Sequence, residues 1–269
     1  MTEKPNLSQE NRPLASVIMA AGQGKRMQDP SFPKVLYPVG GEPMLGHVVR
    51  LCEELCAFPI IPIIGYGRNA VSTYLSEKFP EAKIAIQEEQ LGTGHAVQQA
   101  ERELDGFNGD LLILSGDVPL LTPETASRLI AHHRECKEAA TVLTVHMPNP
   151  TGYGRILRNE KGRLKSIVEE RDATPEERTI EEINTGIYVF NSDILFDVLK
   201  RIDRKNSQSE YYLTDTFKLI IEQFGPDAVA VVSTHDPIEV SGVNTKEQLA
   251  ALEAEFERRT ILASVVTIS

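Results

Sequence analysis

Short runs of consecutive apolar residues alternate with segments of helical periodicity along the first 146 residues of the chain. The apolar runs lie at 15–20, 59–64, 83–87, 110–114 and 140–146, and helical spacing occurs at 44–56, 70–79, 94–104 and from 122 onward. Strands that are apolar at every position are buried on both faces, as in a parallel sheet covered by helices. The pattern predicts an α/β fold with a Rossmann-like, mostly parallel mixed sheet flanked by helices. Ligands of such sheets bind at the carboxyl ends of the strands, where we expect the functional residues.

The pattern changes after residue 148. Short strands are expected at 152–157, 164–169 and 186–190, followed by a helix at 211–224, a strand at 228–232 and a helix at 245–259. We expect residues 1–13 to form a flexible N-terminal extension and residues 14–269 to form one domain. Within that domain we expect a core at 14–148, a small inserted α+β lobe at 149–205, and a return to the core with a C-terminal helix at 206–269.

The composition restricts the partners. The chain has 28 Lys and Arg residues against 39 Asp and Glu residues, a net charge of −11, which argues against a nucleic-acid binder or an anionic-membrane binder. A small anionic substrate is still compatible, because a phosphate site needs only a few local cations and backbone N–H groups. The three cysteines do not follow the spacing of a zinc site and are expected to be reduced thiols. Without an apolar leader or an apolar run of membrane-spanning length, the protein is expected to be cytoplasmic.

A glycine-rich turn with two cations follows the first apolar run. It reads Gly22-Gln23-Gly24-Lys25-Arg26, and Lys34 follows after Pro33. A dinucleotide fingerprint would need glycine at Met27, and a P-loop would need glycine at Met19 and Ser or Thr at Arg26, so both patterns fail. The remaining interpretation is a turn whose backbone N–H groups grip a triphosphate while Arg26 contacts phosphoryl oxygens.

The segment from Ala20 to Met27, followed by Pro33-Lys34, resembles the signature of sugar-nucleotide pyrophosphorylases. The closer resemblance is to the uridyltransferase domain of bacterial N-acetylglucosamine-1-phosphate uridyltransferases. It extends from Ala15 to the C-terminus and implies the nucleotide-diphospho-sugar transferase fold. The acetyltransferase β-helix of the bifunctional members has no counterpart in these 269 residues, and the oligomeric state stays open.

The resemblance assigns the nucleotide site. Residues 87–97, which read QEEQLGTGHAV, match the base-binding segment, with Gln87 and Thr93 selecting uracil; His95 is interpreted as structural. Asp117 follows a buried strand and is a natural Mg²⁺ ligand, with Asn244 as the second ligand. Catalytic roles fall to Arg26, Lys34 and Asp117. The expected nucleotide-binding residues are Met19, Ala20, Ala21, Gly22, Gly24, Lys25, Gln87, Gly92, Thr93, Ser115 and Gly116.

The resemblance also assigns a sugar site to the lobe at 149–205. The expected sugar-binding residues are Gly154, Glu169, Asn184 and Asn244. The charged side chains of Glu170, Arg171 and Asp172 are expected to be solvated.

The predicted reaction is Mg²⁺-dependent transfer of a uridylyl group from UTP to N-acetylglucosamine 1-phosphate. One alternative is a pyrophosphorylase for another sugar or base, such as glucose 1-phosphate with UTP or dTTP, or a cytidylyltransferase. Another is a non-catalytic regulator that binds nucleotide sugars.

Overall fold

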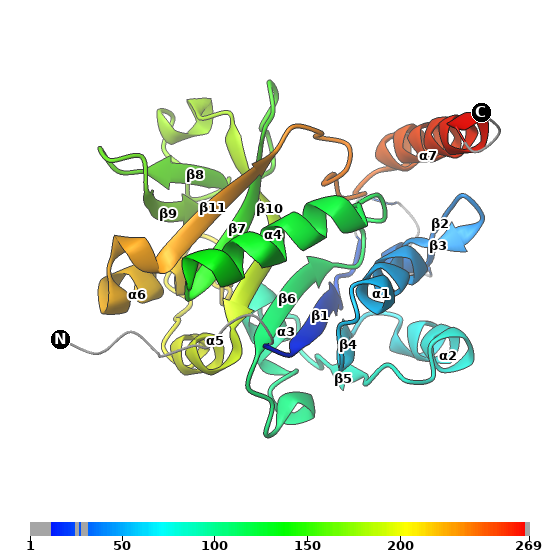
Figure 1. Ribbon diagram of the computed structural model, residues 1–269, viewed down its shortest axis with the longest axis horizontal. Coiled ribbons are helices and arrows are strands. Elements are labelled where there is room, and N and C mark those ends of the chain that lie inside the picture. The colour runs from blue at the N-terminus through cyan, green and yellow to red at the C-terminus, as the bar shows by residue number, and fades with distance from the viewer. Residues whose placement is uncertain (1–11, 25–26, 28–31, 267–269) are drawn as a thin grey trace.

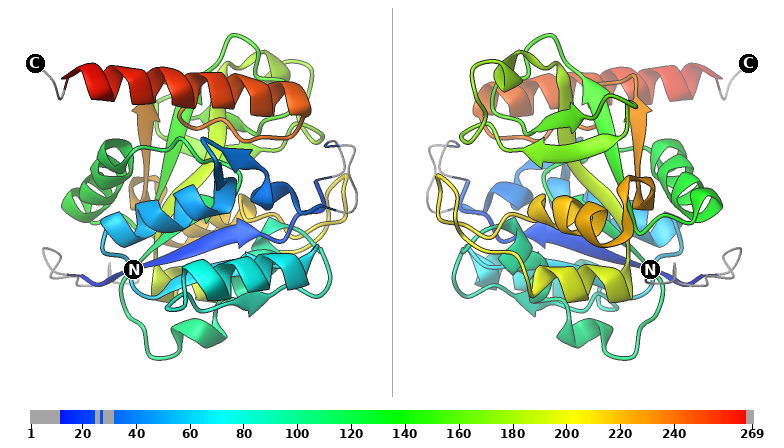
Figure 2. Two further views of the ribbon diagram at one scale, coloured as in Figure 1. Left: turned by 90° about the vertical axis from the view of Figure 1, so that its right-hand side faces the viewer. Right: turned by 90° about the vertical axis from the view of Figure 1, so that its left-hand side faces the viewer.

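The computed structural model describes residues 12–24, 27 and 32–266. They confirm the α/β fold, with a nine-stranded mixed sheet covered by helices on both faces (Figure 1, Figure 2). The strands of this sheet are β1 (Leu14–Ala20), β4 (Ile60–Ile64), β5 (Ala85–Ile86), β6 (Asp110–Ser115), β7 (Ala140–His146), β8 (Arg155–Arg158), β9 (Leu164–Val168), β10 (Glu182–Asn191) and β11 (Val229–Thr234). A separate hairpin is formed by β2 (Pro38–Val39) and β3 (Glu42–Pro43).

Seven α-helices are found in the described part of the chain. They are α1 (Met44–Glu54), α2 (Arg68–Lys78), α3 (Thr93–Gln98), α4 (Pro123–Cys136), α5 (Ser192–Leu199), α6 (Asp215–Phe224) and α7 (Lys246–Val266). Short 3-10 helices are η2 (Lys34–Leu36), η3 (Arg102–Leu104), η4 (Glu177–Thr179) and η5 (Pro226–Ala228). Within the described ranges, no helix combines the length and apolar character needed to cross a membrane.

The strand order is β11-β7-β10-β6-β1-β4-β5. Neighbouring strands from β6 to β5 are parallel, as are β7 and β11, whereas β10 runs antiparallel between β6 and β7. The carboxyl ends of β1, β4, β5 and β6 therefore meet at one edge, and the start of β10 lies at that same edge. Residues from the expected core and the expected lobe can thus meet there.

The core has two layers, because consecutive strand side chains point to opposite faces of the sheet. Val17 belongs to the layer with α3, α5 and α6, and Ile18 belongs to the layer with α1, α2 and α4. Both residues are fully buried. Apolar residues at consecutive positions of β1 are thereby explained.

Four elements differ from the sequence expectation. β10 is longer than the predicted strand at 186–190 and joins the central sheet, and α5 was not predicted. The predicted helix at 94–104 divides into α3 and η3. The predicted helix at 211–224 begins only at Asp215, because Tyr211 pairs its backbone with a distant segment: its N–H donates to the Leu91 carbonyl at 2.8 Å and its carbonyl accepts from the Gly94 N–H at 2.8 Å. We call residues 206–214 the strap.

Candidate active site

A cleft of about 570 Å³ opens at the carboxyl edge of the sheet. Its lining includes these predicted site residues: Met19, Ala20, Ala21, Gly22, Gly24, Lys34, Gln87, Gly92, Thr93, Ser115, Asp117 and Asn244. Gln23, Val35, Gln90, Ala96 and Glu210 line it as well, although they were not singled out as individual site residues. Gly116 lies beneath the lining, beside Ala20 and Leu45. The predicted Lys25 and Arg26 lie outside the described residues.

The glycine-rich turn packs closely on Lys34. Gly24 has φ +60°, and a Cβ at this position would lie 2.8 Å from the Lys34 Cβ. Glycine is therefore required both by the backbone conformation and by the close approach. The side-chain amide of Gln23 donates to Oε1 of Gln90 at 3.4 Å, which links the turn to the segment after β5.

Lys34, Asp117 and Asn244 form a cluster at the floor of the cleft. The Lys34 ammonium donates to Asp117 Oδ2 in a close ion pair and to Asn244 Oδ1 at 3.3 Å. The Ser115 hydroxyl donates to the other Asp117 oxygen at 2.6 Å. A Cβ on Gly242 would lie 3.3 Å from Asp117 Oδ2, so glycine leaves this carboxylate room. The carboxylate and the amide oxygen thus converge on one positive charge.

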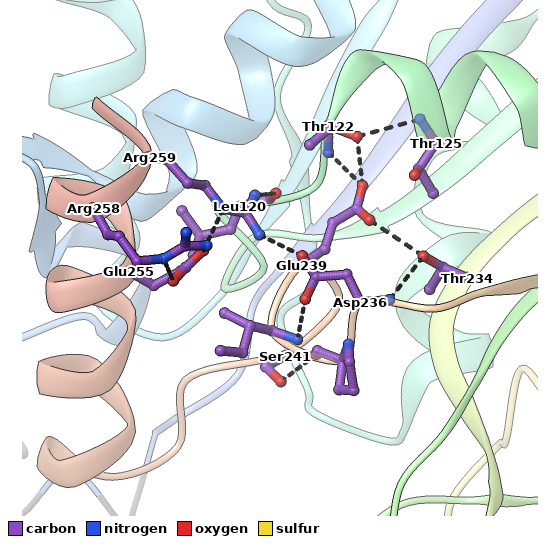
Figure 3. Close-up of polar contacts among 12 residues, drawn as sticks. Leu120, Thr122, Thr125, Thr234, Asp236, Glu239, Ser241, Glu255, Arg258 and Arg259 are labelled. Carbon is purple, nitrogen blue, oxygen red and sulfur yellow. Dashed lines mark hydrogen bonds and ion pairs between the residues drawn. The ribbon is translucent and has the colours of Figure 1, made fainter. Parts of the chain in front are cut away.

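A polar network holds the two segments that carry Asp117 and Asn244 (Figure 3). Glu239 is 4% exposed. Its Oε1 accepts from the Thr122 N–H at 2.9 Å and from the Thr122 hydroxyl at 2.6 Å, and its Oε2 accepts from the Thr234 hydroxyl at 3.3 Å. Thr122 follows Asp117 by five residues, and Glu239 precedes Asn244 by five. The Glu239 carboxylate therefore fastens the Asn244 segment to the Asp117 segment.

Helix α7 reaches the same network. Arg259 donates to the Leu120 carbonyl at 3.2 Å and to Asp236 Oδ2 at 2.8 Å, and its Nε donates to Glu255 at 2.7 Å (Figure 3). Seven residues earlier in the helix, Leu252 is buried in a small apolar cluster. The helix thereby braces both segments at the cleft floor from outside.

Gln87 lies at the cleft wall, where Gly92 and His95 of the predicted base-binding segment hold its side chain. It is 3% exposed, and its Nε2 lies 3.1 Å from both the Gly92 carbonyl oxygen and Nδ1 of His95. The Thr93 hydroxyl accepts from the Leu213 N–H at 3.0 Å, which ties the strap to α3. Gly92 has φ +113°, and a Cβ there would lie 2.5 Å from the Tyr211 carbonyl oxygen.

Three of the four predicted sugar residues, Gly154, Glu169 and Asn184, lie in the lobe, and Glu169 contacts the strap. The Thr214 hydroxyl donates to Glu169 at 2.9 Å. Burial raises the pKa of Glu169, partly offset by this hydrogen bond. The Asn184 amide donates to the Tyr188 hydroxyl at 2.8 Å and accepts from the Gly186 N–H at 3.2 Å.

Gly154 is buried next to these residues, and its carbonyl accepts from the Asn184 N–H at 2.9 Å. Gly154, Glu169 and Asn184 are not part of the cleft lining, whereas Asn244 is. The sugar-site assignment of the first three therefore stays a prediction.

Two charges of the lobe that were expected to be solvated have protein partners. Glu170 Oε2 accepts from Arg155 at 2.8 Å, and Arg155 is only 1% exposed. Asp172 accepts from the Tyr212 hydroxyl at 3.0 Å and from the Ser207 N–H at 2.8 Å. That expectation was wrong for Glu170, which is half-buried and balances a buried guanidinium. Asp172 is exposed as expected, and it also fastens the strap to the lobe.

Cation binding at the cleft would rely on few protein ligands. Among residues 12–24, 27 and 32–266, no group of three or more His, Cys, Asp and Glu side chains could hold a metal ion. Asp117 and Asn244 supply one carboxylate and one amide oxygen. Mg²⁺ commonly takes one or two protein oxygens and completes its shell with water and substrate phosphate.

Comparison with known proteins gives one family. A sequence model described as nucleotidyl transferase matches residues 15–234. The chain is 46% identical over 244 residues to the bifunctional protein GlmU of Halalkalibacterium halodurans, covering 91% of this chain and 52% of the relative. It is 44% identical over 248 residues to the bifunctional protein GlmU of Alkaliphilus metalliredigens, covering 92% and 53%. The chain thus spans about half the length of these curated relatives.

Solved structures share the fold. A putative glucose-1-phosphate thymidylyltransferase from Bacillus anthracis, in complex with a sucrose, superimposes with a TM-score of 0.69 at 20% identity, covering 90% of this chain and 95% of that chain. A UDP-glucose pyrophosphorylase complexed with UDP-glucose gives a TM-score of 0.73 at 16% identity, covering 92% and 99%. At these identities the likeness shows the fold alone.

Proposed function

Because the chain belongs to the nucleotidyl transferase family, we propose that it forms UDP-N-acetylglucosamine and pyrophosphate from UTP and N-acetylglucosamine 1-phosphate. One observation carries this proposal. The glycine-rich turn, the base segment around Gln87 and the cluster of Lys34, Asp117 and Asn244 line a single cleft. A nucleoside triphosphate needs these three kinds of contact together. The similarity to bifunctional GlmU proteins supports the choice of uridine and of the sugar.

The reaction is an in-line displacement. A phosphate oxygen of the sugar phosphate forms a bond to the α-phosphorus of UTP, and the bond from that phosphorus to the β-phosphate oxygen breaks. Pyrophosphate leaves with the electron pair, so the protein does not have to form a covalent intermediate. Its task is to position two polyanions and to offset their charge. The backbone of the turn and the side chains of Lys34 and Arg26 are proposed for that task.

Asp117 and Asn244 fit a divalent cation, because their oxygens already converge on the Lys34 ammonium. A bound Mg²⁺ would lower the repulsion between the phosphates and polarise the α-phosphoryl group. Asp117 would supply the charged ligand and Asn244 a neutral one. Ser115 holds the second Asp117 oxygen and so orients the carboxylate.

The lobe at 149–205 is proposed to bind the sugar. The Glu169 carboxylate can accept hydrogen bonds from sugar hydroxyls, while Gly154 and Asn184 shape the surface beside it. The strap connects this lobe to the base segment through Thr214 and Leu213. A cytoplasmic location goes with this proposal, because the proposed substrates are cytoplasmic metabolites.

Pyrophosphate release tests the activity across UTP, dTTP and CTP, each combined with N-acetylglucosamine 1-phosphate or glucose 1-phosphate. The proposal expects the highest kcat/KM for UTP with N-acetylglucosamine 1-phosphate, and no turnover after Mg²⁺ is removed with EDTA. Asp117→Ala should lose activity while the circular dichroism spectrum is retained. Asp227→Ala, at an exposed carboxylate outside the cleft, should keep both the activity and the spectrum. A preference for another pair would identify a different pyrophosphorylase. Binding of UDP-N-acetylglucosamine without Mg²⁺-dependent turnover would indicate a regulator.

A further inference from the structure

The orientation of the Gln87 amide is fixed by its neighbours. Gln87 Nε2 lies 3.1 Å from the Gly92 carbonyl oxygen. A backbone carbonyl can only accept a hydrogen bond, so the atom facing it must be the amide nitrogen and not the amide oxygen. The same nitrogen carries a second hydrogen and lies 3.1 Å from Nδ1 of His95. Nδ1 must therefore be the unprotonated, accepting nitrogen of a neutral imidazole.

The side-chain amide of Gln99 also lies beside the His95 ring, but it does not change the assignment of Nδ1 as the accepting nitrogen. Gln99 Nε2 lies 3.3 Å from the other ring nitrogen, Nε2, and 2.9 Å from the His95 backbone carbonyl oxygen. A neutral imidazole has only one accepting nitrogen. Gln99 is half-buried, so water can accept its second hydrogen, and its contact with the ring is the longer of the two. Gln87 is only 3% exposed and lies nearer to the ring, so the accepting nitrogen is assigned to Nδ1. The ring is also held by Tyr211, whose centroid lies 6.4 Å away in a stacked arrangement.

With both amide hydrogens engaged, the oxygen is what Gln87 can offer to the cleft that it lines. An acceptor matches a pyrimidine whose ring nitrogen carries a hydrogen, as in uracil and thymine. Cytosine has an unprotonated ring nitrogen at that place, and its amino group would reach the oxygen only after a shift of the base. We propose that His95 is a positioning residue for base selection, because it accepts from Gln87 and so presents the amide oxygen to the base.

The inference rests on the proposed function only in that the substrate is a pyrimidine nucleoside triphosphate. His95 acts through Gln87 and does not itself touch the base. Sites built to hydrogen-bond one pattern of donors and acceptors reject analogues that lack it, because buried polar groups are then left unpaired. Removal of the His95 acceptor leaves one hydrogen of the buried Gln87 amide without a partner, and the amide is then held by the Gly92 carbonyl alone.

Four variants test the proposal. His95→Phe keeps an aromatic ring beside Tyr211 but removes the acceptor. His95→Gln removes the acceptor at the δ position while staying polar, and serves equally where the phenylalanine variant does not fold. His95→Asn keeps an acceptor near the position of Nδ1, and Gln99→Ala removes only the contact to the other ring nitrogen. For each we would measure kcat/KM with UTP and CTP, and the dissociation constants of both nucleotides by calorimetry.

We expect the ratio of UTP to CTP in kcat/KM to fall about tenfold in His95→Phe and His95→Gln, mainly through a higher KM for UTP. His95→Asn and Gln99→Ala should keep the ratio within about threefold of the wild type. An equal loss for UTP and CTP in the first two variants, or an asparagine variant that behaves like them, would overturn the role of His95. Absence of wild-type turnover with UTP would instead refute the proposed function, and the two dissociation constants would still test His95.

Discussion

Replacing Glu239 should test whether the polar network below the cleft positions the proposed Mg²⁺ ligands. The carboxylate accepts two hydrogen bonds from Thr122, at 2.9 and 2.6 Å, and one from Thr234 at 3.3 Å. Thr122 also caps α4, because its hydroxyl oxygen accepts from the Thr125 N–H at 3.3 Å while its hydrogen goes to Glu239. Glu239→Ala removes the acceptor for both Thr122 donors at a site only 4% exposed.

An orphaned buried donor costs about 1–3 kcal/mol, and part of the loss for two donors is offset because the carboxylate itself no longer has to be buried. We therefore expect Glu239→Ala to lower the free energy of unfolding by about 3 kcal/mol, or Tm by roughly 6–12 °C. Glu239→Gln is the matched control, because its amide oxygen can still accept from Thr122 and its nitrogen can donate to Thr234. It should cost about 1 kcal/mol or less.

The functional consequence follows from the position of Glu239 between the two segments. A loosened Asn244 segment should raise the Mg²⁺ concentration for half-maximal activity about five- to tenfold in Glu239→Ala, with little change in Glu239→Gln. Urea unfolding and a magnesium titration of pyrophosphate release measure the two effects separately. Equal stability of the alanine and glutamine variants, or an unchanged magnesium requirement in the alanine variant, would refute the reasoning.

Three further predictions concern single side chains. Burial lowers the pKa of His133 from 6.5 to about 4, so between these pH values the unfolded chain binds a proton that the folded chain does not. The free energy of unfolding should therefore fall by up to about 3 kcal/mol as the pH drops through this range. Urea unfolding from pH 7 to pH 4 should show this fall, and His133→Asn should reduce it. Because the pKa of Glu169 is raised, acidification should begin to increase the KM for the sugar phosphate at a higher pH than it would with an ordinary glutamate. Glu169→Gln should raise this KM about tenfold at neutral pH while the KM for UTP stays within twofold. Equal changes in both KM values would argue against a sugar-specific role. Gly24 has φ +60°, and the Cβ added in Gly24→Ala would lie 2.8 Å from the Lys34 Cβ. This variant should lose about 1–2 kcal/mol of stability and have a lower kcat/KM for UTP. The Cβ added in Gly22→Ala meets no atom within 4 Å, so this variant should keep wild-type stability in thermal unfolding.

Much of the cleft could be predicted from the sequence because parallel strands bring their following loops together. The apolar runs at 15–20, 83–87 and 110–114 correspond to β1, β5 and β6, and the structure brings Gly22, Gln87 and Asp117 to one edge. This step needs only local patterns and the geometry of a parallel sheet. The grouping of Asp117 with Asn244, by contrast, followed from the family resemblance and not from spacing.

The strap and the central strand β10 could not be predicted in the same way. Tyr211, Tyr212 and Leu213 continue the apolar periodicity of α6, so local spacing favours a helix. Long-range backbone hydrogen bonds between Tyr211 and the residues Leu91 and Gly94 keep residues 211–213 out of the helix. Likewise, β10 looks like another short strand of the lobe until its pairing with β6 and β7 is seen.

The same contrast, between local sequence patterns and long-range contacts, separates the residues proposed to contact a substrate from the residues that orient them. Gln87 and Asp117 belong to recognisable segments, because a short loop must carry a suitable side chain at a fixed place after a strand. Glu239 lies 117 residues from Thr122, and no local sequence pattern marks it as the residue that connects the two segments. His95 stands only eight residues from Gln87, yet the sequence alone gives neither which ring nitrogen accepts nor which amide it holds. Because the donors and acceptors of the cleft depend on such orientations, the proposed base preference would depend on His95 as well as on Gln87.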